Sequence, residues 1–589
     1  MSVDPSYVKS VDDLLRGIEN GEYAIPLFQR KFEWQPQMVS ELIVSILQDY
    51  YTGLLLFWEL PDEFSMGEWD PIWGARKPEK PSIMVLDGQQ RLSSLYYAIY
   101  SPEKKFPNRN TYYRFFIDIA RYLEGDYEEA VYYEYSRRYM SLQEIKDRKE
   151  TWIENNRFPL SLLQDRKFLN SEFNEWLTSY TKNFVDPEEI ESFLETRDKI
   201  AKIRNILDYG FITHTLGKER ELPDICEIFA RINQKGMRLS TFDLMNAFLF
   251  PRGIHLREIW EQNDRLEIKR IHPKMGEYLL KTVSLYKQDY CSSKYIYYLV
   301  PGHQIKKRDE QKKVAIVKDK EEFMELWNKS YRYTAKAVER IKNTGKNDFG
   351  AIKDIFIPNT TMIPVMAAIL WTYDELGTNK ISERKFNETL SRWFWSAVVL
   401  ESYSGSSDSI MSEDYRDFKK WFDKKDESVI RRIRNISPER IDKLDFRNIK
   451  MGSALYKGIM CLLALNGVRD FFTGRTIDTG TYRAEKVHDH HIFPKNIKNL
   501  PESSLFKSTR DCILNKTLIL DETNEKINHR RPSEYLRKID LDESQVKEVM
   551  NTHFISERAR QYLLNDDYDN FILERERTIK ERLKELLGL

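Results

Sequence analysis

Apolar positions follow two different patterns along the first 250 residues. Short apolar runs of strand length occupy residues 54–60, 82–86 and 113–119. Between them, residues 37–47 and 224–232 place apolar side chains every three or four positions, which is typical of helices that bury one face. This mixture predicts an α/β or α+β domain that ends near residue 250.

The pattern changes after this point. Strand-like runs become rare up to about residue 445, and long amphipathic stretches such as residues 321–341 and 387–401 predict a helical domain. Beyond residue 445, a helix over residues 453–465 precedes two strand-like segments and a helix-rich tail. We therefore predict an α+β multidomain protein with domains at residues 1–250, 251–445 and 446–589.

Composition narrows the class of protein. Lys and Arg number 93, as do Asp and Glu, so the formal net charge is zero, which excludes a polybasic protein and makes any nucleic-acid contact local. The four cysteines are scattered without a C-x-x-C pair, which indicates neither a disulfide framework nor a zinc ribbon. No apolar run reaches the roughly 18 residues of a membrane span, and no signal peptide is evident. We expect a cytoplasmic protein without a membrane partner.

A histidine cluster near the C-terminus is the most informative segment. Residues 486–496 read KVHDHHIFPKN, so His488, His490 and His491 fall within four positions although the chain has only nine histidines. If this segment is a strand, His490 and His491 point to opposite faces. Residues 513–536 then predict an apolar strand, a polar turn and a helix with Asn524 and Asn528 on one face.

This combination resembles the HNH endonucleases, whose ββα-metal unit joins a His-containing strand, a second strand and a helix. The matching elements are His-His-Ile-x-Pro, an Asn-Lys step within the second strand and an Asn in the following T-N-x-K turn. The resemblance implies that His490 binds a divalent metal, that His491 is the general base and that Asn515 orients His491. It also implies that Asn524 is the second metal ligand and that Asn528 is a further metal-site residue.

These residue types suit the hydrolysis of a phosphodiester bond. Phosphodiester hydrolysis needs a nucleophile at neutral pH and a cation that stabilises the developing charge, and an imidazole of ordinary pKa near ~6.5 suits proton abstraction. We expect Mg²⁺ or Mn²⁺, with a softer transition ion left open. A histidine-rich surface loop or an incidental zinc site is the alternative, and the positions of the asparagines favour the nuclease.

Basic residues around the cluster are candidates for contact with DNA phosphates. Residues 483–538 hold 12 Lys and Arg against 8 Asp and Glu, a small surplus that is also typical of an ordinary solvated surface. The candidate DNA-binding residues are Lys495, Lys498, Lys516, Arg530 and Arg531.

Two motifs in the first hundred residues suggest a second site. Residues 23–36 carry Gln29 and Arg30 among aromatic side chains, and residues 83–99 run from an apolar strand through Asp87 and Gly88 into a helix. A helix N-terminus offers free N–H groups and a positive dipole end to phosphate. No G-x-x-x-x-G-K-[ST] sequence is present, which excludes a P-loop NTPase. By itself the motif is equally compatible with a capped helix.

Together with residues 228–248, these motifs resemble the N-terminal domain of GmrSD-type modification-dependent restriction proteins, a domain related to the ParB/sulfiredoxin-like fold. The two resemblances cover roughly residues 10–250 and 440–575. The likeness implies a nucleotide site formed by Asp87, Gly88, Gln89, Gln90 and Arg91, with Gln29 and Arg30 facing the nucleotide or the DNA. Ser240 and Asp243 are expected to cap a helix.

We therefore expect a defence endonuclease that uses a divalent metal and an NTP and cuts foreign DNA, in particular modified phage DNA. The nucleotide is not identified, and a homo-oligomer is compatible with these features. Two alternatives remain open: an RNA-cleaving toxin with the same HNH site, and a nucleotide-switched DNA-binding regulator whose nuclease site is degenerate.

Overall fold

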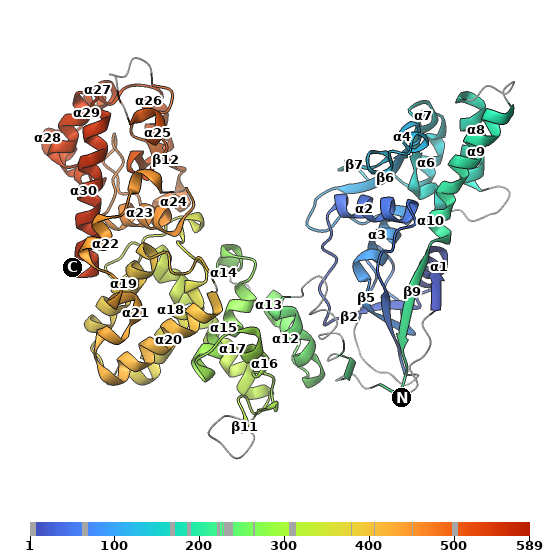
Figure 1. Cartoon of the computed structure of the whole chain (residues 1–589), viewed down its shortest axis with the longest axis horizontal. Coiled ribbons are helices and arrows are strands. Elements are labelled where there is room, and N and C mark those ends of the chain that lie inside the picture. Colours follow the sequence, from blue (N-terminus) through green and yellow to red (C-terminus); the bar gives the residue numbers. More distant parts are fainter. Residues whose placement is uncertain are drawn as a thin grey trace. The chain divides into compact units, whose positions relative to one another are not determined.

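The computed structural model divides into two compact units, residues 1–257 and 258–589 (Figure 1). It describes the whole chain except residues 1–6, 62–68, 165–170, 185–189, 221–223, 226–227, 229–239, 263–265, 306–313, 379, 406, 450, 498–502 and 504. Both the predicted helical domain and the predicted nuclease segment fall within the second unit. The division between them near residue 445 stays a prediction.

The first unit is a mixed α+β domain, as the hydrophobic pattern predicted. Its six-stranded sheet has the order β1-β9-β3-β5-β2-β4, and a three-stranded antiparallel sheet has the order β7-β6-β8. The strands are β1 (Tyr7–Ser10), β2 (Tyr23–Pro26), β3 (Leu55–Glu59), β4 (Trp69–Asp70), β5 (Ile83–Asp87), β6 (Tyr112–Asp118), β7 (Val131–Ser136), β8 (Arg157–Pro159) and β9 (Gly210–Leu216). In the larger sheet, β5 lies parallel to β2 and antiparallel to β3.

Eleven helices lie within the described residues of the first unit. They are α1 (Val11–Glu19), α2 (Pro36–Leu47), α3 (Gln89–Tyr100), α4 (Ile119–Glu124), α5 (Tyr127–Ala130), α6 (Leu142–Asp147), α7 (Lys149–Glu154), α8 (Glu172–Phe184), α9 (Ile190–Ala201), α10 (Asn205–Asp208) and α12 (Thr241–Leu249). The expected helix cap is confirmed, because Ser240 and Asp243 form a reciprocal capping box at the start of α12. The R-I-N-x-x-G stretch before it lies outside the described residues.

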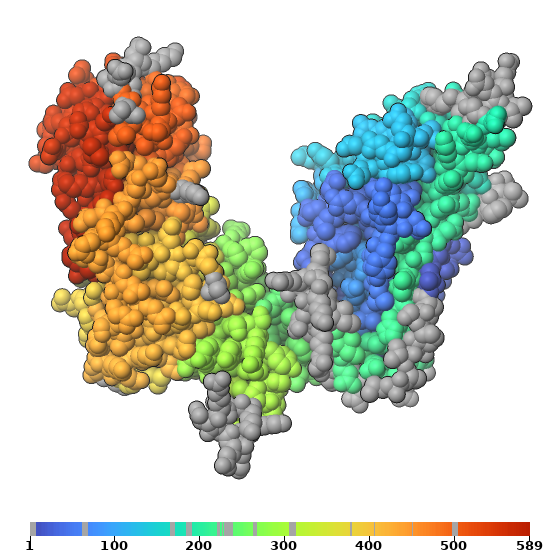
Figure 2. Space-filling view, viewed as in Figure 1, coloured from blue at the N-terminus to red at the C-terminus, as the bar shows by residue number. Residues whose placement is uncertain are grey.

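The second unit is dominated by helices and forms one continuous body, from yellow-green to red in Figure 2. Its first part contains α14 (Leu266–Ile271), α15 (Met275–Gln288), α16 (Ser293–Tyr297), α17 (Lys320–Lys342), α18 (Met362–Thr372), α19 (Glu383–Val399), α20 (Ser407–Lys424), α21 (Arg431–Arg434) and α22 (Pro438–Asp442), with the short strands β10 (Gln304–Ile305) and β11 (Val314–Ala315); α13 (Leu256–Gln262) spans the boundary with the first unit. Every residue of α18 is buried, so this helix forms the centre of the bundle. No helix among the described residues has both the length and the apolar character needed to cross a bilayer.

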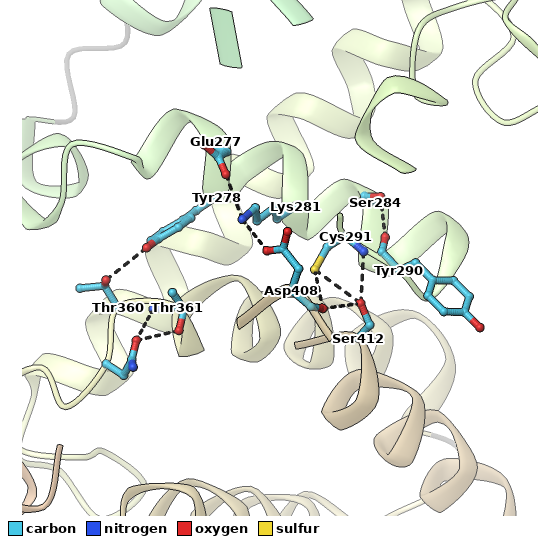
Figure 3. A network of polar contacts seen from close by, with 11 residues as sticks. Glu277, Tyr278, Lys281, Ser284, Tyr290, Cys291, Thr360, Thr361, Asp408 and Ser412 are labelled. Carbon is cyan, nitrogen blue, oxygen red and sulfur yellow. Dashed lines mark hydrogen bonds and ion pairs between the residues drawn. The ribbon is translucent and has the colours of Figure 1, made fainter. Parts of the chain in front are cut away.

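A buried ionic network ties this helical part together (Figure 3). Lys281 of α15 is 7% exposed, and its ammonium lies 2.9 Å from Glu277 and 2.8 Å from Asp408. Beside it, the buried backbone N–H of Cys291 donates to Ser412 at 3.3 Å. Because a buried cation is stable only when it is paired, these contacts fix α15 against the start of α20.

The last part of the second unit carries the histidine cluster. Its elements are α23 (Ala454–Leu465), α24 (Thr479–Ala484), β12 (Val487–His491), α25 (Phe506–Thr509), β13 (Lys516–Leu520), α26 (Asp521–Ile527), α27 (Pro532–Tyr535), α28 (Glu543–Thr552), α29 (Glu557–Leu564) and α30 (Tyr568–Leu587). Helix α23 packs against both α19 and β13. The hairpin is therefore supported directly by the helical part of the unit.

Candidate active site

The histidine cluster lies on a two-stranded antiparallel hairpin that leads directly into a helix. Strand β12 pairs with β13 so that His490 faces Thr517 and His491 faces Lys516. Helix α26 begins at Asp521, the residue after β13. The two strands and the helix occur in the predicted order, but α26 follows β13 without the polar turn that the sequence predicted.

Alternation along β12 sends its polar side chains to two faces. On one face, His488 contacts Asp521 and His490 contacts Asn524, both on α26. On the other face, His491 contacts Asp511. The prediction that His490 and His491 point to opposite sides is confirmed.

His490 combines burial with an unused ring nitrogen. Its side chain is 7% exposed, and Nδ1 lies 2.9 Å from Oδ1 of Asn524. Burial lowers the pKa of His490 to about 4, so the ring is neutral at physiological pH. The amide oxygen only accepts hydrogen bonds, so Nδ1 carries the hydrogen and Nε2 carries the lone pair. Nε2 is buried and has no hydrogen-bond partner among the described residues.

His491 is held differently. Its Nε2 lies 2.9 Å from Oδ1 of Asp511, and the same carboxylate oxygen lies 2.5 Å from the ammonium of Lys495. Burial, followed by the charge of Lys516, lowers the pKa of His491. The ring is thus a neutral base with one nitrogen fixed by a carboxylate.

The side chain of Asn515 makes no hydrogen bond to His491 among the described residues, and its expected role in orienting His491 stays a prediction. Its fully buried amide accepts a hydrogen bond from Phe493 N at 2.8 Å and donates to Phe493 O and Arg510 O at 2.9 and 2.8 Å. The residue ends the short 3-10 turn Ile513–Asn515, which places its side chain against the main chain that follows β12. Asn515 therefore fixes the backbone on both sides of the His491–Asp511 contact.

Asn528 was expected to share a helix face with Asn524, but it lies outside the helix. Helix α26 ends at Ile527, and Asn528 is exposed with a φ of 50°. Pro532 at the start of α27 holds Arg531 in an extended conformation, so the helix cannot continue through this segment. Asn tolerates the left-handed conformation that the reversal requires.

Two buried charged residues that sequence analysis missed hold the hairpin in place. Arg575 of α30 donates to Leu514 O at 2.5 Å, Lys516 O at 2.8 Å and His553 O at 3.0 Å, and burial lowers its pKa to about 9. Asp470 accepts hydrogen bonds from Leu520 N at 2.9 Å and Thr523 Oγ1 at 2.6 Å. These groups fix both ends of β13 and the start of α26.

The residues proposed to contact DNA already have protein partners where the structure describes them. Lys495 pairs with Asp511, and Lys516 is buried with its ammonium 3.9 Å from Asp489. The other two pair locally: Arg530 with the carbonyl of Lys526, and Arg531 with Glu534. Lys498 lies outside the described residues. Contact of these residues with DNA stays a prediction.

The N-terminal motif forms the expected strand, glycine turn and helix. Gly88 has a φ of 101°, and a Cβ at this position would lie 2.2 Å from the side chain of Leu55. Glycine is therefore required between β5 and α3 both by conformation and by space.

The polar side chains of this motif mostly bind the main chain of neighbouring loops. Buried Gln29 donates to Leu86 O at 3.1 Å. Gln90 accepts from Glu33 N at 2.9 Å and Trp34 N at 3.2 Å and donates to Lys31 O at 3.1 Å.

Arg91 holds a second loop. It donates to Thr52 O and Leu54 O, each at 2.8 Å, and pairs with Asp87 at 3.1 Å. Gln89 is buried, whereas the side chains of Asp87 and Arg30 are 39% and 22% exposed. Three of the predicted nucleotide contacts, Gln29, Gln90 and Arg91, thus have a demonstrable structural role.

Comparison with known proteins adds two findings. The family model of the GmrSD restriction endonuclease N-terminal domain matches residues 11–250. The uncharacterized protein MJ0686 of Methanocaldococcus jannaschii is 31% identical over 623 residues, covering 98% of this chain and 99% of its own length. Residues 11–250 belong to the GmrSD N-terminal domain family, and the whole chain belongs to one family with this archaeal protein.

The GmrSD match lies within the first unit and contains the β5–α3 turn. The archaeal relative, in contrast, aligns with nearly the full length of this chain, so both units have counterparts in that protein. The domain family that matches residues 11–250 is named for a restriction endonuclease, a class of enzyme that acts on DNA.

Proposed function

We propose that the chain is a nucleotide-regulated, metal-dependent DNA endonuclease whose second unit cuts the DNA through an HNH-type site. The observation that carries the proposal is the buried, unpartnered Nε2 of His490 on a strand–strand–helix unit. Leaving a buried polar atom without a partner costs about 1–3 kcal/mol, so its retention beside Asn524 favours a ligand-binding role. The domain family that matches residues 11–250 is named for a restriction endonuclease.

The residues present fit a divalent metal. His490 would bind it through Nε2, while Asn524 accepts the hydrogen of Nδ1 and so holds the ring in place. Because the two ring nitrogens point to different sides of the imidazole, Asn524 would become a ligand of the same metal only after this contact is broken. Within the described residues, no group of three or more His, Cys, Asp and Glu side chains is placed to hold a metal, so further ligands would come from phosphate oxygens and water. Such a metal stabilises negative charge on the phosphate and on the leaving oxygen.

His491 would take the proton from the attacking water. It is a neutral imidazole next to His490 in sequence, and it faces away from α26. A positioned base of this kind contributes about 10²- to 10⁴-fold to the rate. The second unit thus offers a ligand position and a base at adjacent residues of one strand.

Nucleotide control would reside at the β5–α3 turn of the first unit. Because Gln29, Gln90 and Arg91 hold the surrounding loops, we assign the phosphate contacts to the main-chain N–H groups at the start of α3. The partly exposed Asp87 and Arg30 would complete the site. The DNA target would be foreign and modified, as the resemblance to modification-dependent restriction proteins suggests.

One assay tests the proposal. Purified full-length protein is incubated with plasmid DNA, with phage DNA carrying hydroxymethylated or glucosylated cytosines, and with RNA, each with Mg²⁺ or Mn²⁺ and with or without each NTP. We expect cleavage of modified DNA that depends on metal and changes with one NTP, and loss of cleavage in His491→Ala. His529→Ala, in which an exposed histidine of the same segment is replaced, is the matched control.

The other outcomes separate the alternatives. Cleavage of RNA alone would support the toxin, and DNA binding without cleavage would support the regulator with a degenerate nuclease site. A His491→Ala variant that folds normally and cuts at the wild-type rate would exclude the HNH assignment.

A further inference from the structure

Asp511 occupies a place that the HNH resemblance did not assign to any residue. It follows α25 on the segment that leads into β13, 20 residues after His491, and its carboxylate contacts the ring of His491 at 2.9 Å. Building on the proposed function, we propose that Asp511 is a positioning residue that fixes the tautomer and orientation of the general base His491.

The chemistry of the contact determines which ring nitrogen is available. An ionised carboxylate only accepts hydrogen bonds, so Nε2 of His491 must carry the hydrogen in this pair. In the neutral ring, Nδ1 then carries the lone pair. Nδ1 makes no hydrogen bond to any residue in the part of the chain that the structure describes. The nitrogen that faces away from Asp511 is therefore the one able to accept a proton.

Two further residues, Lys495 and Asn515, hold this contact in place. Lys495 binds the same carboxylate oxygen at 2.5 Å. Asn515 joins Phe493, two residues after His491, to Arg510, the residue before Asp511, through hydrogen bonds of 2.8–2.9 Å. The distance between the end of β12 and the turn that carries Asp511 is thus set by a fully buried amide and not by the ion pair alone.

The role in the reaction follows from proton balance. An O–H bond of the attacking water breaks and its proton goes to Nδ1 of His491, while the water oxygen forms a bond to phosphorus. The bond from phosphorus to the leaving ester oxygen breaks, and that oxygen departs with the electron pair and is then protonated. His491 becomes an imidazolium at this stage, and the adjacent carboxylate of Asp511 stabilises its charge.

An ordinary surface ion pair is the competing explanation, because the side chain of Asp511 is 56% exposed and exposed pairs contribute little to stability. A second His–Asp contact on the same hairpin serves as the control for this explanation. His488 contacts Asp521 in the same way, but on the opposite face of β12. Asp521→Asn therefore measures what the loss of a His–Asp contact on this strand does by itself.

The experiment compares Asp511→Ala, Asp511→Asn, Asp511→Glu and Asp521→Asn in full-length protein, with Mn²⁺ and the DNA and nucleotide that the wild-type protein cuts best. We expect Asp511→Ala to lower kcat about 10- to 100-fold, the range for a group that orients an active-site histidine. KM for DNA and the Mn²⁺ concentration for half-maximal activity should stay within about twofold, since Asp511 touches neither. Asp511→Asn should not restore kcat, because its NH₂ group can favour the wrong tautomer, whereas Asp511→Glu should restore part of it.

A double-mutant cycle gives the sharpest result. If Asp511 acts only through His491, adding Asp511→Ala to His491→Ala should leave the residual rate unchanged within about twofold. A further 10- to 100-fold loss in the double variant, an unchanged kcat in Asp511→Ala, or an equal loss in Asp521→Asn would each overturn the inference. If wild-type protein cuts no nucleic acid, or His491→Ala cuts normally, it is the proposed function that fails.

Discussion

The β5–α3 turn of the first unit and the β12–β13 hairpin of the second both concentrate polar residues next to an apolar strand, but they use them differently. In the turn, the side-chain groups of Gln90 and Arg91 bind main-chain atoms of neighbouring loops. In the hairpin, His490 keeps a buried ring nitrogen without a partner. A motif whose polar groups bind the backbone explains the fold by itself, whereas the unsatisfied ring nitrogen of His490 needs a separate explanation, for which we propose a bound metal.

The largest expected effect is loss of cleavage when the metal site is removed. Excess EDTA should abolish cutting and added Mn²⁺ should restore it, because the proposed hydrolysis needs a cation that stabilises negative charge on the phosphate and the leaving oxygen. His490→Ala should raise the Mn²⁺ concentration needed for half-maximal activity by at least ~10-fold, with DNA affinity unchanged. Titration of cleavage with Mn²⁺ and a DNA-binding assay measure the two quantities. If DNA is still cut in excess chelator, the hairpin does not need a metal, and the proposed difference between the hairpin and the β5–α3 turn fails.

The second prediction tests the structural role of the N-terminal turn. Gln90→Ala leaves the N–H groups of Glu33 and Trp34 and the carbonyl of Lys31 without their partner, so it should lower the free energy of unfolding of the first unit by about 2–4 kcal/mol. Faster hydrogen exchange at the amides of Glu33 and Trp34 and a lower Tm would show this. Exposed Gln143→Ala is the matched control. A variant with unchanged Tm that no longer binds any NTP would mean that Gln90 is a ligand-binding residue after all.

The third prediction concerns His553, a buried histidine behind the hairpin whose ring nitrogens are both bonded, to Thr517 Oγ1 and Arg469 O at 2.5 Å each. Burial lowers its pKa to about 3, against about 6.5 in an unfolded chain. The unfolded state therefore binds the proton first, so the stabilising contribution is complete above pH ~6.5 and declines as pH falls towards 3. The slope is about 1.4 kcal/mol per pH unit, or about 2 kcal/mol at pH 5.

Urea unfolding of the second unit between pH 7.5 and 5 measures this slope. His553→Gln should be less stable at pH 7.5, because two buried hydrogen bonds change, but its stability should depend less on pH. Equal slopes in the two proteins would show that His553 is not the group that titrates.

The smallest expected effect on stability is that of Asp87→Ala. The side chain is 39% exposed and its pair with Arg91 is supplemented by two main-chain carbonyls, so the free energy of unfolding should change by less than about 1 kcal/mol. The dependence of DNA cleavage on NTP should nevertheless change, because Asp87 is one of the exposed groups at the proposed nucleotide site. Calorimetric titration with each NTP separates the two effects. Normal NTP binding in this variant would place the nucleotide elsewhere.

Features encoded by neighbouring residues were predictable from the sequence. The glycine turn at Gly88, the Ser240–Asp243 capping box and the two strands of the hairpin all depend on short-range patterns. The contact between His490 and Asn524 followed from the order of the elements, because a helix that starts directly after β13 brings Asn524 back to β12.

Features that depend on tertiary packing were not predictable. Arg575 and Arg577 are two residues apart on α30, yet Arg575 is fully buried and binds only carbonyl oxygens, whereas Arg577 is 55% exposed and pairs with Glu574 and Glu581. The helical spacing places Arg575 with Phe571 and Ile579 on the apolar face of α30, but it does not show that carbonyl oxygens of the hairpin meet the guanidinium there. Asp511 was missed for a similar reason, since its partner His491 lies 20 residues earlier. The position of Asn528 depended on the end of α26, which sequence patterns locate poorly.

The hydrogen bonds from Arg575 to the hairpin have a consequence for biosynthesis. Lys516 leaves the ribosome 59 residues before Arg575, which at about 5–20 residues per second amounts to several seconds of translation. During this time the carbonyl oxygens at the start of β13 lack their buried donor, and Asn515 lies between two of them. We therefore expect the growing chain to acquire the geometry of the proposed nuclease site only after α30 has been made. A chain that is still being synthesised would then be unable to cut the DNA of the cell that produces it.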